Sequence, residues 1–322
     1  MIVELEGNLD LISIFTEAGR ECGFGHLSRC CALYDESVSC GYDARLIVNS
    51  SEKLPELSRF TIAANWLNMD VLAPLLNDSD QIIVDSYLAD LSIYCEIAAK
   101  CPIALYIDDD MRISYPKGIV INPSLYGDRL PYPQAKGVSY FGGADYVILR
   151  PEFCLPIVRD NNNDVKCVLI TMGGSDLLQL TAPILSAICQ RLPLVHKYVV
   201  LGSGLADTEE VEEAADANTE IFISLDAMQM REIMLRSDVA ITAAGQTIHE
   251  LLRCGTPMVP VMAADNQKWN IRGLKDLGIQ HINALDGSFD AFSIDWGSLI
   301  WNAPRLAPFI FEGQKRIVKM LR

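Results

Sequence analysis

A histidine in a glycine-rich turn is the first residue of this chain whose setting suits chemistry. The segment from Glu17 to His26 reads EAGRECGFGH and precedes a predicted helix that begins near Leu27. Glycines such as Gly25 let a ligand approach the backbone, and the first turn of a helix offers unpaired N–H groups to anions. His26 can exchange a proton near neutral pH, or it is a histidine satisfied by local hydrogen bonds.

A second glycine turn, residues 172–176 (MGGSD), follows the apolar run VKCVLIT and precedes a predicted helix near Leu180. Gly173, Gly174 and Ser175 suit a loop that lines a phosphate site. The alternative is that the motif only caps the following helix.

A third turn, residues 243–250 (AAGQTIHE), has the same order of strand, glycine and helix. Gly245, Gln246 and Thr247 are expected at the helix N-terminus, where backbone N–H and hydroxyl groups can bind a diphosphate without lysine. Glu250 lies about one turn further on, where a carboxylate can accept hydrogen bonds from both ribose hydroxyls. The alternative for Glu250 is a solvated charge near a helix end.

Polar side chains also follow several other apolar runs. They are Asn266 and Gln267 after PMVPVM, Asp85 and Tyr87 after QIIV, and Asp108 and Asp109 after IALYI. In open α/β sheets the carboxyl ends of the strands line the ligand crevice, so these side chains are candidates to bind a sugar or a catalytic water. Turn and cap chemistry is an equal alternative for residues 108–110.

A repeated pattern of strand, turn and helix positions these motifs. Short apolar, β-branched runs are each followed by a turn and by helical periodicity, as in βαβ units of a parallel sheet. The runs are LISIFTEA, ARLIVN, QIIVDSY, IALYIDD and GIVINP, then VKCVLITMGG, HKYVVLGSG, TEIFISL, DVAITAAG and PMVPVM. We predict two Rossmann-like, doubly wound α/β domains.

The length and composition fit two domains with a cleft between them. The chain has 322 residues and is 50% hydrophobic, enough for two domains of about 150 residues each. The polar run at residues 159–164 predicts a surface loop near the boundary, so we expect domains 1–157 and 158–322. The final stretch EGQKRIVKML has the spacing of an amphipathic packing helix.

The charge and hydropathy exclude several classes of protein. A formal net charge of -16 means that phosphate must be captured locally, so nucleic acid is not an expected partner. No apolar run reaches the roughly 18 residues of a membrane span, and the start MIVELEGNLD lacks a basic leader. We expect a soluble cytoplasmic protein with no integral membrane segment.

The ten cysteines lie mostly in apolar runs, as Cys167 and Cys189 do, which is typical of buried thiols in a reducing compartment. The four between residues 22 and 40 are irregularly spaced and contain no CxxC pair. We therefore predict no metal site, and no other cofactor is indicated.

Taken in order, GFGHLSRC, IIVDSY, YIDDD, ILRPEF, ITMGGSD, AAGQTIHE and AADNQ resemble the UDP-sugar hydrolase family of the pseudaminic acid pathway, which is related to spore-coat polysaccharide proteins and more distantly to GT-B glycosyltransferases. The set spans about residues 17–270. The resemblance implies a GT-B-like fold, with UDP held by the C-terminal domain and the sugar facing the N-terminal domain.

The resemblance also implies roles for particular residues. His26 matches the histidine of the family's GxGH, a catalytic candidate, and Gln246, Thr247 and Glu250 match its diphosphate and ribose contacts. The chain has Leu177 where the family has proline, and Gln246 where it has serine.

The expected reaction is hydrolysis of a UDP-linked amino- or deoxysugar, in surface polysaccharide or nonulosonic acid biosynthesis. His26 would orient or deprotonate a water that attacks the anomeric carbon, and helix N-termini would stabilise the departing UDP. Direct attack predicts inversion at that carbon. Asp85, Tyr87, Asp108 and Asp109 would position the sugar.

Two alternatives remain open at this point. The first is a GT-B glycosyltransferase that passes the sugar to an unknown hydroxyl acceptor, and an exposed apolar patch on the N-terminal domain would favour a lipid-linked one. The second is a non-catalytic nucleotide-sugar binding protein, which the glutamine at Gln246 favours.

Overall fold

A computed structural model describes residues 11–19, 23–50, 54, 59–76, 81–159, 164–174, 176, 178–202, 204, 208–287 and 289–321. The chain divides into two compact units. The first runs through Pro123, resumes at Gly127–Ile148 and takes in the last residues from Glu312, and the second comprises Ser124–Tyr126 and Leu149–Phe311. Residues 1–10 and most of the polar run at 159–164 lie outside the described residues.

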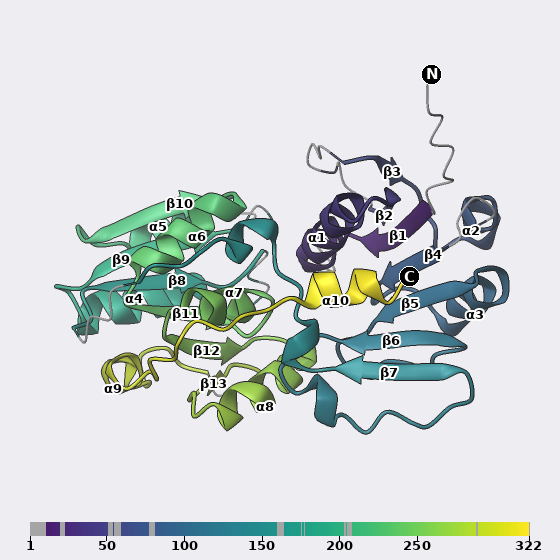
Figure 1. The fold of residues 1–322 in the computed structure, drawn as a ribbon. Helices are drawn as coiled ribbons and strands as arrows, with labels where there is room; N and C mark the ends of the chain where they lie inside the picture. The colour runs from purple at the N-terminus through teal and green to yellow at the C-terminus, as the bar shows by residue number, and fades with distance from the viewer. Residues whose placement is uncertain are drawn as a thin grey trace, which may run out of the picture. The chain divides into compact units, whose positions relative to one another are not determined.

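The first unit is built on a sheet of seven described parallel strands in the order β3-β2-β1-β4-β5-β6-β7 (Figure 1). The strands are β1 Leu11–Glu17, β2 Asp43–Asn49, β3 Thr61–Ala63, β4 Gln81–Asp85, β5 Ile103–Ile107, β6 Gly118–Asn122 and β7 Val138–Gly142. Its helices are α1 Gly25–Ser39, α2 Met69–Leu76, α3 Leu91–Lys100 and α10 Gly313–Lys319, with short 3-10 turns η1 Gly127–Arg129 and η2 Ala144–Tyr146.

The second unit is built on a sheet of six described parallel strands in the order β10-β9-β8-β11-β12-β13. The strands are β8 Cys167–Thr171, β9 His196–Leu201, β10 Thr219–Ile223, β11 Val239–Ala243, β12 Met258–Met262 and β13 Ile282–Asn283. Its helices are α4 Thr181–Arg191, α5 Glu209–Ala214, α6 Ala227–Arg236, α7 Thr247–Cys254, α8 Lys268–Asp276 and α9 Trp296–Trp301, with 3-10 turns η3 Pro151–Cys154 and η4 Asp265–Gln267.

The predicted fold class, two doubly wound α/β domains, is confirmed. Every apolar run named from the sequence becomes a parallel strand. The strands β3, β7 and β13 were not predicted. Their residues are largely half-buried or exposed, so they carry no continuous apolar run, as expected at the edges of a sheet.

The first sheet is buried on both faces, which explains its uninterrupted apolar runs. Along β4, Ile83 belongs to the cluster that includes buried residues of α1 and α10, whereas Ile82 and Val84 pack with residues of α2 and α3. Because side chains alternate along a strand, helices must cover both faces of this sheet.

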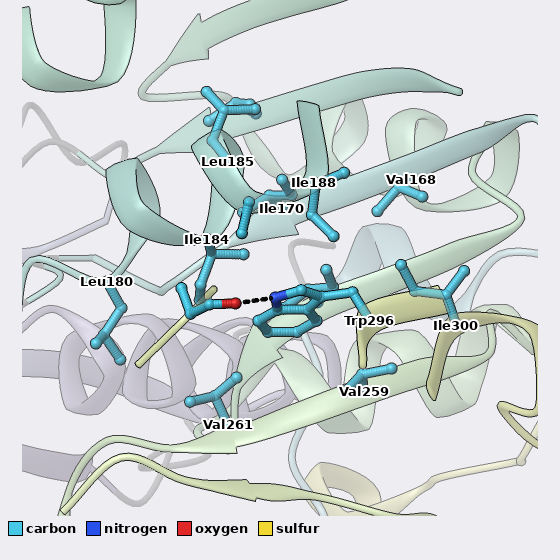
Figure 2. Packing of buried hydrophobic residues seen from close by; sticks show 14 of the residues in the cluster. Val168, Ile170, Leu180, Ile184, Leu185, Ile188, Val259, Val261, Trp296 and Ile300 are labelled. Carbon is cyan, nitrogen blue, oxygen red and sulfur yellow. Dashed lines mark hydrogen bonds between the residues drawn. The ribbon is translucent and has the colours of Figure 1, made fainter. Parts of the chain in front are cut away.

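The core of the second unit gathers around Trp296 of α9. Its ring is fully buried among aliphatic side chains that include Ile184 and Val261 (Figure 2). Its indole Nε1 donates a hydrogen bond of 2.8 Å to the carbonyl of Ala291, so burial leaves no polar group of the ring unpaired. Within the described residues, no helix is both long and apolar enough to cross a membrane.

The last helix, α10, belongs to the first unit and not to the domain expected from the sequence. The sequence places residues 158–322 in one domain, but α10 packs against α1 of the first unit. Ile317 and Leu321 are fully buried in the same cluster as Ile12 and Leu33. The amphipathic face predicted for this stretch therefore finds its partner surface on the first sheet.

Gly313, the first residue of α10, provides a test of this docking. A Cβ at this position would lie 2.2 Å from the carbonyl oxygen of Val147, so we expect Gly313→Ala to destabilise the protein by about 1–3 kcal/mol through overpacking. The matched control is Gly297→Ala in α9, where the nearest atom would be an Asp295 oxygen at 3.5 Å. Thermal unfolding followed by circular dichroism should show a lower Tm only for Gly313→Ala, and equal Tm values would contradict the packing described.

Candidate functional site

Each sheet has one point where its strand order reverses direction. In the first sheet this point lies between β1 and β4, and in the second between β8 and β11. The loops at the carboxyl ends of these strands diverge to opposite faces and leave room for a ligand. The sequence motifs around His26, Asp85, Gly173 and Gly245 all lie at these two points.

The turn between β1 and α1 depends on glycine. Gly19 and Gly23 pair through two backbone hydrogen bonds, of 3.2 and 2.7 Å, and have φ values of 148° and 73°. Such positive φ values favour glycine. A Cβ at Gly25 would meet no atom within 4 Å, and the N-terminus of α1 has no side-chain cap. The turn therefore opens onto space and leads directly to His26.

His26 is held by Asp85, which ends β4. The ring Nδ1 lies 2.7 Å from Asp85 Oδ1, and the two side chains are 5% and 0% exposed. An ionised carboxylate only accepts hydrogen bonds, so this contact matches a proton on Nδ1, whereas Arg29 Nη2, which can only donate, also lies 3.2 Å from the same nitrogen. In the neutral ring with a proton on Nδ1, Nε2 carries the lone pair that a general base requires.

Arg29 completes this arrangement, and the sequence analysis missed it. Its Nε and Nη2 donate to the two oxygens of Asp85 at 2.5 and 2.6 Å, and its Nη1 and Nη2 donate to the two oxygens of Asp109 at 2.9 and 2.8 Å. One buried guanidinium therefore binds two carboxylates. The available signal was spacing, since Arg29 follows His26 by three residues and shares its helix face.

Arg29 also determines the charge of both carboxylates. Burial alone would raise the pKa of Asp85, but Arg29 and His26 together hold it below its usual value. Burial likewise opposes ionisation of Asp109, and Arg29 again lowers the pKa. Both side chains therefore remain charged at neutral pH, although Asp85 is fully buried.

Tyr87 contacts both Asp109 and His26. Its hydroxyl donates to Asp109 Oδ2 at 2.7 Å, and its ring meets the imidazole edge to face at 4.3 Å between centroids. Glu17 positions this tyrosine by accepting hydrogen bonds from the hydroxyl of Ser86 and from the Tyr87 backbone N–H at 2.7 Å. Glu17 was a second residue that the sequence analysis did not identify as functional.

Asp108 does not join the His26 cluster. Its Oδ2 accepts from the Tyr132 hydroxyl at 2.7 Å, and its Oδ1 accepts from the backbone N–H groups of Asp110 and Arg112 at 3.2 and 3.3 Å. Burial raises its pKa. These are the turn and cap contacts considered for residues 108–110.

The glycine turn after β8 both borders open space and caps the following helix. A Cβ at Gly173 or Gly174 would meet no atom within 4 Å, so both border open space. Asp176, however, accepts from the backbone N–H groups of Leu180 and Thr181, each at 2.9 Å, and thereby caps α4. Ser175 lies outside the described residues.

The motifs after β11 and β12 lie side by side. Gln267 Nε2 would be 3.9 Å from a Cβ at Gly245, and Asn270 Nδ2 donates to the carbonyl of Ala244 at 3.0 Å. Thr247 begins α7, whose N-cap residue Gln246 makes no side-chain cap.

Two further predicted residues flank this helix start. Asn266 lies in η4, next to Gln267. Glu250 lies in α7, where it is buried and bound to Arg150. The helix N-terminus of α7 and the polar turn η4 thus form one candidate anion and sugar site in the second unit.

No protein-family model matches the chain, but individual proteins do. It is 25% identical over 293 residues to an uncharacterized protein of Methanocaldococcus jannaschii, a match that covers 85% of this chain and 60% of that protein. It is 23% identical over 273 residues to a Helicobacter pylori protein named pseudaminic acid cytidylyltransferase and UDP-2,4-diacetamido-2,4,6-trideoxy-beta-L-altropyranose hydrolase, covering 83% and 47%. It is also 23% identical over 287 residues to spore coat polysaccharide biosynthesis protein SpsG of Bacillus subtilis, covering 83% and 81%.

The chain therefore spans less than two thirds of the first two of these relatives. Among solved structures it is similar to MurG of Acinetobacter baumannii, with a TM-score of 0.62 at 14% identity over 96% of this chain and 98% of that one. It is similar to S. aureus MnaA bound to UDP, with a TM-score of 0.62 at 11% identity over 97% and 96%. These likenesses establish a GT-B-like fold.

The double role of Arg29 predicts an unusual dependence of stability on pH. Arg29→Met leaves the fully buried Asp85 and the partly exposed Asp109 without the arginine's charge, which we expect to cost about 3–5 kcal/mol at neutral pH. In the wild type the lowered pKa values stabilise the fold above the unfolded pKa of about 4, and this contribution is lost as the pH falls further. In the variant, burial without Arg29 should raise the pKa of Asp85 and of Asp109. Acidification then protonates both carboxylates, so the difference in free energy of unfolding between variant and wild type should become smaller.

Urea unfolding at neutral and mildly acidic pH measures this difference in the free energy of unfolding. The matched control is Arg59→Met, because Arg59 makes a similar two-bond pair with Asp35 that is partly exposed, and we expect it to cost about 0–1 kcal/mol. A gap for Arg29→Met that is independent of pH, or no larger than that of the control, would contradict the assigned role.

Proposed function

We propose that this protein hydrolyses a UDP-linked amino- or deoxysugar by water attack at the anomeric carbon, in surface polysaccharide or nonulosonic acid biosynthesis. The observation that carries the proposal is the pairing of His26 Nδ1 with the buried, ionised Asp85. This pairing leaves Nε2 as a base and provides a carboxylate that stabilises the imidazolium formed in the reaction.

Water is the nucleophile that fits this site best. Cys30 lies close to the pair, with its sulfur 3.6 Å from Asp85 Oδ2. Burial and the charge of Asp85 raise the pKa of Cys30 well above its usual value, so the thiol stays protonated and unreactive. In the proposed step, His26 Nε2 takes a proton from water as its oxygen bonds to the anomeric carbon, and UDP leaves with the electron pair of the broken C–O bond. Inversion at that carbon follows.

We propose that the second unit holds the UDP. The N–H groups at the start of α7 and the open turn at Gly173 and Gly174 would bind the diphosphate, and Glu250 would accept from the ribose hydroxyls. Asn266 and Gln267 would contact the phosphate or the sugar. The net charge of -16 makes such local capture necessary.

The relatives support this class of substrate. The Helicobacter pylori protein carries a UDP-sugar hydrolase name, and the Bacillus subtilis protein is named for spore coat polysaccharide biosynthesis. The nine cysteines that the structure describes are free thiols, which suits an enzyme of a reducing compartment.

A glycosyltransferase is the second candidate, and one observation favours it. Leu88 and Leu91, which follow Tyr87 closely in the chain, are 48% and 46% exposed. Such apolar side chains next to the His26 cluster would suit an apolar acceptor. In that reaction an acceptor hydroxyl takes the place of water, and His26 keeps its role.

Release of UDP from a panel of UDP-amino- and UDP-deoxysugars, without acceptor and with or without EDTA, distinguishes these candidates. We expect release by the wild type, and a loss of about 10²–10⁴-fold in His26→Ala with UDP affinity retained, because only the proton acceptor is removed. The matched control is His196→Ala. His196 begins β9 and pairs with Glu220, so its replacement should leave the rate of UDP release unchanged.

Two other outcomes of the UDP-release assay would lead to different conclusions. UDP binding without release by the wild type would favour a transferase that awaits its acceptor, or a binding protein. Equal release by the wild type and His26→Ala would contradict the catalytic role of His26.

A further inference from the structure

Glu17, the last residue of β1, is a fully buried acid that binds the turn after β4. Its Oε1 accepts from the backbone N–H of Tyr87 at 2.7 Å. Its Oε2 accepts from the hydroxyl of Ser86 and, at 3.4 Å, from the backbone N–H of Leu88. Because β1 and β4 are neighbouring parallel strands, their carboxyl ends meet, and Glu17 ties one to the other.

Ser86 extends this anchoring along the turn. Its hydroxyl donates to Glu17, and its oxygen accepts from the backbone N–H groups of Leu88 and Ala89 at 3.1 and 2.9 Å. The consecutive backbone N–H groups of residues 87–89 are therefore all bonded, either to the carboxylate or to the hydroxyl that the carboxylate orients. An N–H group that is withdrawn from water without a partner is costly. These bonds therefore fix the backbone of the turn.

A carboxylate is the side chain that fits these donors. Both oxygens of a carboxylate accept hydrogen bonds, whereas a glutamine amide has one accepting oxygen and an NH₂ group that only donates. A glutamine in place of Glu17 could accept from Tyr87, or from Ser86 and Leu88, but its NH₂ group would then face the remaining donors. Glu17→Gln therefore keeps the shape of the side chain and breaks the anchoring on one side of the turn.

The turn carries Tyr87 to the imidazole of His26. The Tyr87 hydroxyl donates to Asp109 Oδ2 at 2.7 Å, and the tyrosine ring meets the imidazole edge to face at 4.3 Å between centroids. The three hydrogen bonds of Glu17 end at residues 86–88 and do not reach His26. The chain of contacts from Glu17 to the histidine therefore runs through Tyr87.

We propose that Glu17 is a positioning residue, which holds the turn so that Tyr87 packs against His26 and keeps the imidazole in one orientation. The part of this inference that concerns the rate rests on the proposed function, because it takes His26 as the proton acceptor. A displacement of about 1 Å in a reacting group can lower a rate by about 10²-fold. Glu17 should therefore matter for turnover although its side chain is fully buried.

A purely structural role for Glu17 would resemble that of Asp90. The Oδ1 of this exposed residue accepts from the backbone N–H and the hydroxyl of Ser92 at 2.9 and 2.6 Å, and from the backbone N–H of Ile93 at 3.2 Å. These bonds cap α3 and do not involve the turn that carries Tyr87. Asp90→Asn is therefore the matched control, since it also exchanges a carboxylate for an amide close to the end of β4.

A double-mutant cycle tests whether Glu17 acts through Tyr87. The rate of UDP release is measured with the UDP-amino- or UDP-deoxysugar that the wild type cleaves fastest. We expect Glu17→Gln to lower kcat by roughly 10–100-fold, and Tyr87→Leu to lower it at least as much. Glu17→Gln should cause no further loss in the Tyr87→Leu background, because the positioned ring is already gone. Asp90→Asn should keep the kcat of the wild type.

A second readout does not depend on activity. A tyrosine ring this close shifts the proton resonances of the carbon-bound hydrogens on the His26 ring, and the spectrum of His26→Ala identifies them. We expect Glu17→Gln to move these resonances toward their positions in Tyr87→Leu. Asp90→Asn should leave them in place.

The contrary results separate this inference from the proposed function. Failure of the wild type to release UDP overturns the proposed function, and the His26 resonances then decide the inference alone. Unmoved His26 resonances in Glu17→Gln, or losses in kcat that multiply in the double variant, overturn only the inference. If Glu17→Gln does not fold by circular dichroism, Glu17→Asp, whose shorter side chain draws the acceptors back from the turn, takes its place under the same criteria.

Discussion

One buried guanidinium, that of Arg29, is the interaction on which the first unit's site depends. It binds Asp85 at the end of β4 and Asp109 after β5, and it starts from the same helix as His26. The buried Asp85 and the partly exposed Asp109 would repel each other and favour their protonated forms if Arg29 did not lie between them. With Arg29 in place both stay ionised, so Asp85 can hold the proton on His26 Nδ1. Arg29 thus sets the charge of the carboxylate that contacts the histidine, from three residues away on the same helix.

The second unit also contains an arginine that is paired with a buried carboxylate. Arg150 meets Glu250 edge to edge, and Glu250 lies in the first turn of α7. The chain is strongly acidic, so it has no general attraction for anions, and under the proposed function backbone N–H groups supply the positive potential for the diphosphate. In both units an arginine forms two hydrogen bonds to a buried carboxylate and opposes the rise in pKa that burial causes.

The sequence predicted the buried strands well, because helices on both faces of a parallel sheet impose continuous apolar runs. It did not predict edge strands such as β7, whose residues are half exposed. It also placed Asp85 and Asp109 at the correct sheet edge, since strand ends fix that position. It could not separate Asp109 from Asp108, because neighbouring residues leave a strand in opposite directions and only the packed partners decide which one meets Arg29. Arg29 itself was missed because helical spacing shows a shared face but not what that face touches.

The tautomer of His26 is the most direct test of this account. Long-range proton–nitrogen correlation spectra of the protein labelled with ¹⁵N-histidine distinguish the two ring nitrogens of each of the four histidines, and the spectrum of His26→Ala identifies the relevant signals. The account predicts, under mildly alkaline conditions, a protonated Nδ1 and an unprotonated Nε2 in His26. A protonated Nε2 with a bare Nδ1, or rapid averaging of the two forms, would contradict it.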